Sequence, residues 1–82
     1  MNKILVTVYV LELDESYDVL LPINLKMDEV YELIQNTIFD LSSGNYQKHD
    51  NVMLLNKDGK VINNNNVVRL SGLTNGCQVV LI

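Results

Sequence analysis

Residues 27–41, MDEVYELIQNTIFDL, carry the clearest periodic pattern in the sequence. Apolar side chains recur in it every three or four residues, and polar side chains fill the positions between. A helix with 3.6 residues per turn brings positions with that spacing onto one face. The apolar positions are Val30, Leu33, Ile34, Ile38 and Leu41, and the polar positions are Glu29, Glu32, Gln35, Asn36 and Asp40. The pattern predicts one amphipathic helix from Met27 to about Leu41.

Both ends of this helix carry the expected signals. Asp28 and Glu29 fall in its first turn, where a carboxylate interacts favourably with the helix dipole by about 0.3–1 kcal/mol. Ser42-Ser43-Gly44-Asn45 follows its last turn, and Gly44 can adopt the left-handed conformation that ends many helices.

Two strands are expected before the helix. Lys3–Leu13 is rich in Val, Ile, Leu and Tyr, which favours a strand. Tyr17–Ile23 alternates between two faces, and Asp14-Glu15-Ser16 separates the two runs, so together they predict a hairpin. Pro22 has no N–H to donate to a neighbouring strand, which places the second strand at an edge of the sheet.

Two further strands and a loop are expected after the helix. Asn51–Asn56 alternates as a third strand, and Asp58-Gly59 is a tight turn into a short fourth strand, Lys60–Ile62. The asparagine run Asn63–Asn66 is best explained as a solvated loop, because it is only four residues long.

The end of the sequence completes the pattern. Leu70–Leu73 is compatible with a single turn, Asn75-Gly76 with a tight turn, and Cys77–Ile82 with a last strand. The predicted element order is therefore β-β-α-β-β-β in one domain, residues 1–82. This is an α+β layout, with the helix packed across one face of a mixed sheet.

Composition excludes several classes of function. Net charge is −4 and the isoelectric point is near 4.6, so the basic surface of a nucleic-acid binder is absent. No basic run would hold the chain on an anionic membrane, and no apolar stretch approaches the roughly 18 residues of a membrane span. One cysteine, Cys77, cannot form an internal disulfide, which fits the reducing cytoplasm.

Three segments carry a resemblance to a known fold: Tyr17–Pro22, Asn56–Lys60 and Gly72–Gly76. With the element order, they resemble the ubiquitin-like β-grasp fold, whose strand order is 2-1-5-3-4. Within that fold the chain is similar to the YukD/EsaB-like proteins associated with bacterial type VII secretion. The resemblance implies a cytoplasmic accessory protein that binds protein partners, secretion-system components among them, and has no chemistry of its own.

The alternative within the same fold is a ubiquitin-like modifier or a sulfur carrier. Such proteins act through an extended C-terminus that ends in Gly-Gly. This sequence ends Val79-Val80-Leu81-Ile82, with bulky and β-branched side chains inside the expected last strand. We therefore expect a protein that is not conjugated.

Catalytic and cofactor sites find little support. His49 in Lys48-His49-Asp50 is expected as a solvated loop residue, and Cys77 as a buried or half-buried structural thiol. One His and one Cys do not supply a metal ligand set, and the glycines are isolated rather than grouped in a phosphate-binding loop. We expect no enzyme activity, no metal and no cofactor.

The outer face of the sheet is the expected site of function. Alternation places the following side chains toward the helix: Ile4, Val6, Val8, Val10, Tyr17, Val19, Leu21, Val52, Leu54, Val79 and Leu81. Their neighbours then point outward as an apolar patch: Leu5, Tyr9, Leu20, Met53, Leu55 and Val80. Strand order brings Leu20, Tyr9 or Leu5, Val80 and Leu55 side by side.

Such a patch on a solvated sheet face is typical of a site for another protein or for a second copy of the chain. Two alternatives remain open at this point. A shift of register by one residue would turn these side chains into the core, and the chain ends could instead cover the face.

Overall fold

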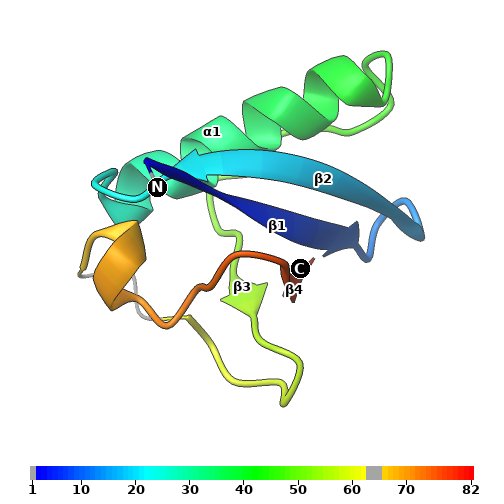
Figure 1. Cartoon of the computed structure of the whole chain (residues 1–82). Coiled ribbons are helices and arrows are strands. Elements are labelled where there is room, and N and C mark those ends of the chain that lie inside the picture. The colour runs from blue at the N-terminus through cyan, green and yellow to red at the C-terminus, as the bar shows by residue number, and fades with distance from the viewer. Residues whose placement is uncertain (1, 63–65) are drawn as a thin grey trace.

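The computed structural model describes residues 2–62 and 66–82, which form a mixed four-stranded sheet with one helix across one face (Figure 1). The sheet order is β2-β1-β4-β3. The elements are β1 (Lys3–Val10), β2 (Glu15–Pro22), α1 (Met27–Leu41), β3 (Leu54–Leu55), the 3-10 helix η1 (Val68–Leu70) and β4 (Cys77–Leu81). This arrangement confirms the expected α+β class.

The strand pairing follows the expected order, but several expected strands are shorter: the first ends at Val10 and not at Leu13, and only Leu54–Leu55 of the expected third strand, Asn51–Asn56, is paired as a strand. β1 pairs with β2 antiparallel and with β4 parallel, and β3 pairs with β4 antiparallel. The expected fourth strand, Lys60–Ile62, is reduced to a single bridge between Val61 and Leu55. Two backbone hydrogen bonds of 2.8 Å flank this bridge, from the Asn56 N–H to the Lys60 carbonyl and from the Ile62 N–H to the Leu54 carbonyl.

β2 lies at an edge of the sheet, as Pro22 predicted. α1 has the predicted bounds. Gly44 adopts a left-handed φ of +82° just after it, and its N–H donates to the Phe39 carbonyl at 2.8 Å. Glycine takes this conformation without the steric penalty that other residues meet, so it closes the helix end.

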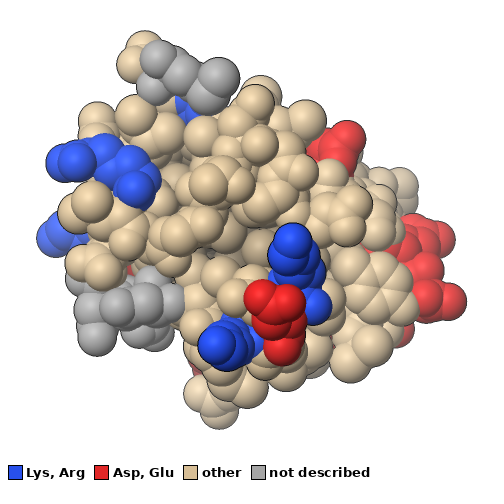
Figure 2. All heavy atoms as spheres, turned by 60° about the horizontal axis from the view of Figure 1, so that its bottom comes forward, with Lys and Arg blue, Asp and Glu red and all other residues tan. Residues whose placement is uncertain are grey.

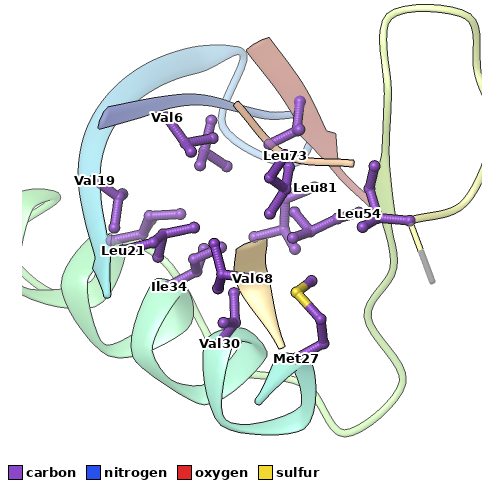
Figure 3. Close-up of a cluster of buried hydrophobic side chains, with 14 of the residues drawn as sticks. Val6, Val19, Leu21, Met27, Val30, Ile34, Leu54, Val68, Leu73 and Leu81 are labelled. Carbon is purple, nitrogen blue, oxygen red and sulfur yellow. The ribbon is translucent and has the colours of Figure 1, made fainter. Parts of the chain in front are cut away.

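The core lies between the sheet and α1, as Figure 3 shows for residues from both layers. All eleven residues expected to point inward do so: nine are buried, and Tyr17 and Val52 are half-buried and packed against the others. Full burial of a Val or Leu side chain contributes about 1.5–3 kcal/mol. The register alternative is therefore excluded, because the outward set is not the core.

Two predictions about the helix faces are wrong. Leu41 was assigned to the buried face, but it is 56% exposed, because it lies in the last turn, close to the end of the helix. Gln35 was assigned to the solvated face, but it is 6% exposed. Its amide is satisfied by the segment that follows the helix, so burial leaves no polar atom unpaired.

Connecting segments complete the core with side chains that the strand and helix patterns did not identify. Tyr46, Ile62, Val68 and Leu73 are all buried. The turn expected at 70–73 is present at Ser71-Gly72, and η1 precedes it at Val68–Leu70, where Val68 is buried in the core.

The solvated loop expected at 63–66 falls largely outside the described residues. Its last member, Asn66, accepts a hydrogen bond from the Met27 N–H at 3.0 Å. Within the described residues, the one α-helix is too short and too polar to cross a membrane.

Candidate protein-binding surface

The outer face of the sheet carries a continuous line of apolar side chains, one from each of four adjacent segments. Tyr9 of β1 pairs with Val80 of β4, Val80 pairs with Leu55 of β3, and Leu55 is bridged to Val61. We call these four residues the apolar row. Val61 is 57% exposed, and the other three are half-buried by their neighbours.

The apolar surface continues from the row toward the C-terminal ends of β1 and β4. Met53 and Ile82 exchange two backbone hydrogen bonds of 3.0 Å, which extends the pairing of β3 with β4 by one residue. Met53 is 43% exposed and Ile82 40%. Leu11, just after β1, is 57% exposed. In Figure 2, uncharged atoms form a large continuous part of the surface.

Leu5 and Leu20 form a separate apolar pair. They face each other across β1 and β2 and are 38% and 57% exposed. Leu5 lies four residues from Tyr9, which is about 13 Å along a strand. The structure therefore brings Tyr9, and not Leu5, beside Val80 and Leu55, and places Leu20 away from that group.

A polar line separates the pair from the apolar row. It consists of Asp18, Thr7 and Gln78 on β2, β1 and β4. The Thr7 hydroxyl donates to Asp18 Oδ1 at 2.8 Å. The six residues proposed from the sequence thus occupy two surfaces, with Tyr9, Met53, Leu55 and Val80 in the larger one.

The turn between β1 and β2 carries carboxylates toward both faces of the sheet: Asp14 reaches Tyr9 beside the larger surface, and Glu15 lies with Tyr17 on the side of α1. Tyr9 donates its hydroxyl to Asp14, which has a left-handed φ of 52°, and Tyr17 donates to Glu15 at 2.7 Å. These hydrogen bonds are the main cause that raises the pKa of each tyrosine. Acidic side chains gather at this end of the molecule, to the right in Figure 2.

A buried polar network fixes the segment that leads from α1 toward β3. Gln35 donates from Nε2 to the His49 carbonyl at 3.0 Å, and its Oε1 accepts from the His49 N–H and from the Tyr46 hydroxyl, both at 2.8 Å. Burial is the main cause that raises the pKa of Tyr46, and the Glu12 carboxylate adds to it. The network holds the backbone of His49 against the helix.

The side chain of His49 makes a contact that the sequence did not indicate. Its Nε2 lies 2.8 Å from Glu12 Oε1, and this hydrogen-bonded pair, which is an ion pair when the imidazole is protonated, links the segment to the turn between β1 and β2. Both side chains are close to half exposed, so the pair contributes at most about 1 kcal/mol. His49 is an exposed residue, as expected, but a paired one.

An apolar pocket of about 260 Å³ lies between that ion pair and the C-terminal ends of β1 and β4. β1 and β4 are parallel, so these ends meet at one end of the sheet. The pocket is lined by Val10, Leu11, Glu12, Tyr46, His49, Asn51, Val52, Leu81 and Ile82. It is contiguous with the larger apolar surface through Leu11 and Ile82.

Little in the described residues points to chemistry at an active site. No group of three His, Cys, Asp or Glu side chains among residues 2–62 and 66–82 is arranged to hold a metal ion. Cys77 is half-buried at the start of β4, as expected for a structural thiol.

Comparison with solved structures identifies the fold as ubiquitin-like. The ubiquitin-like domain of EccD5 from Mycobacterium xenopi is 17% identical, with a TM-score of 0.64, and the match covers 100% of this chain and 94% of that chain. Further matches include ubiquitin-like domains of other proteins.

Two other matches show how widely the fold is used. A chain of the MycP5-free ESX-5 inner membrane complex, State II, is 15% identical with a TM-score of 0.70, and all of this chain matches 21% of that chain. A chain of a toluene 4 monooxygenase complex is 12% identical with a TM-score of 0.75, and the match covers 96% of this chain and 95% of that chain.

At these identities the likeness shows the fold alone. No protein-family model and no curated protein matches the sequence.

Proposed function

We propose that this chain is a non-conjugated ubiquitin-like interaction module, and that it acts as a cytoplasmic accessory component of a bacterial type VII secretion system. The observation that carries the binding role is the apolar row on the outer sheet face. A sheet face that met only water would alternate toward polar side chains, and this one keeps Tyr9, Leu55, Val61 and Val80 in register.

Burial of this surface by a partner supplies the driving force. Removing apolar area from water contributes about 25 cal/mol per Å², and the row with Met53 provides five adjacent side chains. Interface centres are depleted in charge and enriched in aromatic residues and Met, and this surface has no charged member and includes Tyr9 and Met53. Asp14, in the turn beside the row, would lie at the polar rim of such an interface.

Two kinds of support favour type VII secretion as the setting. The segments Tyr17–Pro22, Asn56–Lys60 and Gly72–Gly76 resemble those of the YukD/EsaB-like proteins. Similar folds also occur in the EccD5 ubiquitin-like domain and in a chain of the ESX-5 inner membrane complex.

The main alternative, a modifier or sulfur carrier, requires a free extended tail. Val79 and Leu81 are 2% exposed, all of Cys77–Leu81 is paired with β1, and Val80 and Leu81 are also paired with β3. These residues are held in the centre of the sheet and are not available as a flexible tail. We therefore expect that an activating enzyme does not adenylate the chain, so that no chain-dependent exchange of labelled pyrophosphate into ATP is measured.

Capture from cells that contain a type VII secretion system tests the proposal. The wild-type chain, Val61→Asp, Met53→Asp and the control Leu70→Asp are immobilised, and the bound proteins are identified by mass spectrometry. Leu70 is 60% exposed and lies on η1, so the control introduces the same charge elsewhere.

We expect the wild type and Leu70→Asp to recover a secretion ATPase or membrane component, and the two row-side variants to lose it. Equal recovery by all four chains would refute the role of the row. If the immobilised chain captured only further copies of the same chain from the cells, the protein would be a self-associating one and the secretion role would be refuted.

A further inference from the structure

We infer that the pocket at the end of the sheet receives one aromatic side chain of a partner segment that carries a Lys or Arg beside it. This inference rests on the proposed function only in that the occupant belongs to a protein. It assigns a second contact site, distinct from the apolar row, and it specifies the chemistry of the residue that fills it.

The size of the pocket favours a single side chain. Its volume is about 260 Å³, below the roughly 300–1,000 Å³ of sites that bury whole small-molecule ligands. Val10 and Leu81 are buried in its wall, and Val52 is half-buried there. A pocket of this kind beside a larger apolar surface is typical of an anchor position in a protein interface.

The shape of the wall favours an aromatic anchor. The rings of Tyr46 and His49 lie edge to face, with centroids 5.9 Å apart and planes at 89°. A third ring entering beside them would extend an arrangement that aromatic groups prefer. The wall is also preformed, because Gln35 holds both the Tyr46 hydroxyl and the His49 backbone from the buried side. Preformed sites bind without an added cost of ordering.

The charge at the mouth favours a basic neighbour. Glu12 is the acidic residue of the lining, and its Oε1 is the atom that faces His49. Its neighbour in the same turn, Asp14, accepts the Tyr9 hydroxyl instead, so Glu12 is the carboxylate that a basic group of the partner would meet at the pocket. No Lys or Arg lines the pocket, and the adjacent Lys48 is turned to the helix, with Nζ donating to Asn36 Oδ1 at 2.7 Å.

Titration of the full chain with a synthetic peptide tests the inference. The probe is acetyl-Gly-Lys-Trp-Lys-Gly-amide, followed through the backbone amide signals of the ¹⁵N-labelled protein. Shifts are expected at Leu11, Asn51 and Ile82. Replacing the probe's Trp by Ala is expected to weaken binding about tenfold or more, since both ring burial and ring pairing are lost. Replacing both lysines by Glu is expected to abolish it.

Two protein variants distinguish binding at the pocket from a general attraction of the basic probe to an acidic protein. Glu12→Gln is expected to weaken the probe about two- to fivefold, the range for an exposed charge pair. Glu32→Gln removes an equal charge from the exposed face of α1 and is expected to change nothing. Equal effects of the two variants, or shifts that lie elsewhere, would overturn the inference.

The failure of this inference is distinguishable from failure of the proposed function. Val61→Asp alters the apolar row outside the pocket, so it is expected to leave probe binding unchanged while it abolishes capture of the partner protein. A chain that captures its partner but does not bind the probe would refute the pocket alone.

Discussion

Gln35→Met should uncouple the segment after α1 from the helix. The substitution keeps an unbranched side chain of similar length and removes three buried hydrogen bonds, two to the backbone of His49 and one to the Tyr46 hydroxyl. A typical intramolecular hydrogen bond contributes about 0.5–1.5 kcal/mol net, so the expected loss is about 2–4 kcal/mol in the free energy of unfolding.

That loss is large for a chain of 82 residues. Domains of this size lose about 4–8 °C of melting temperature for each kcal/mol, so a loss of about 2–4 kcal/mol should lower the midpoint by about 8–32 °C. Urea unfolding followed by circular dichroism gives the free energy directly. Amide exchange near residues 46–49 should also accelerate, because those backbone groups lose their partner from the helix.

Gln47→Met is the matched control, because Gln47 lies in the same segment and is exposed. It should change the free energy of unfolding by less than about 0.5 kcal/mol. A Gln35→Met variant as stable as this control would show that apolar packing, and not the buried amide, fixes the segment.

Three further predictions follow from the structure. Tyr46→Phe should lower the free energy of unfolding by about 0.5–1.5 kcal/mol at pH 7, because it removes the hydroxyl that donates to Gln35. In urea titrations at several pH values, the contribution of the Tyr46 hydroxyl to the wild-type free energy of unfolding should be fully present below pH about 10. It should be lost as pH rises through the raised native pKa of Tyr46, so the wild type should lose more stability than the variant. Gly44→Ala should lower the free energy of unfolding by about 1–2 kcal/mol in the same assay, because its φ is +82°; no loss would contradict the left-handed helix end. Leu20→Asp with Leu55→Asp should leave the far-ultraviolet circular dichroism spectrum unchanged, because both side chains point away from α1; unfolding would show that they are core residues.

The inward face of the sheet was predictable because it depends on a local pattern. β1 alternates Ile4, Val6, Val8 and Val10 with more exposed neighbours, and a period of two leaves one face for the core. The bounds of α1 were predictable for a similar reason, since a 3.6-residue period persists over fifteen residues and Gly44 ends it.

The composition of the surface needed information that no local pattern contains. Whether Tyr9 or Leu5 lies beside Val80 depends on the register between β1 and β4, two parallel strands that are far apart in the sequence. The separate register between β1 and β2 pairs Leu20 with Leu5, so Leu20 lies apart from the apolar row.

Gln35 was wrongly assigned to the solvated face because a polar side chain can be buried when its hydrogen-bond partners come from elsewhere in the sequence. The groups that satisfy its amide belong to residues eleven and fourteen positions later in the sequence. The ion pair between His49 and Glu12 spans 37 positions, so the pocket that it borders was equally invisible in the sequence.

Mapping the contact surface of the captured partner on the ¹⁵N-labelled chain tests the central claim most directly. The largest amide shift changes should fall on Tyr9, Leu55, Val61 and Val80, and the exposed apolar side chains at the end of α1, such as Phe39, should be unaffected. Changes concentrated on α1, with the four residues of the apolar row unaltered, would contradict the proposal that this module binds through its outer sheet face.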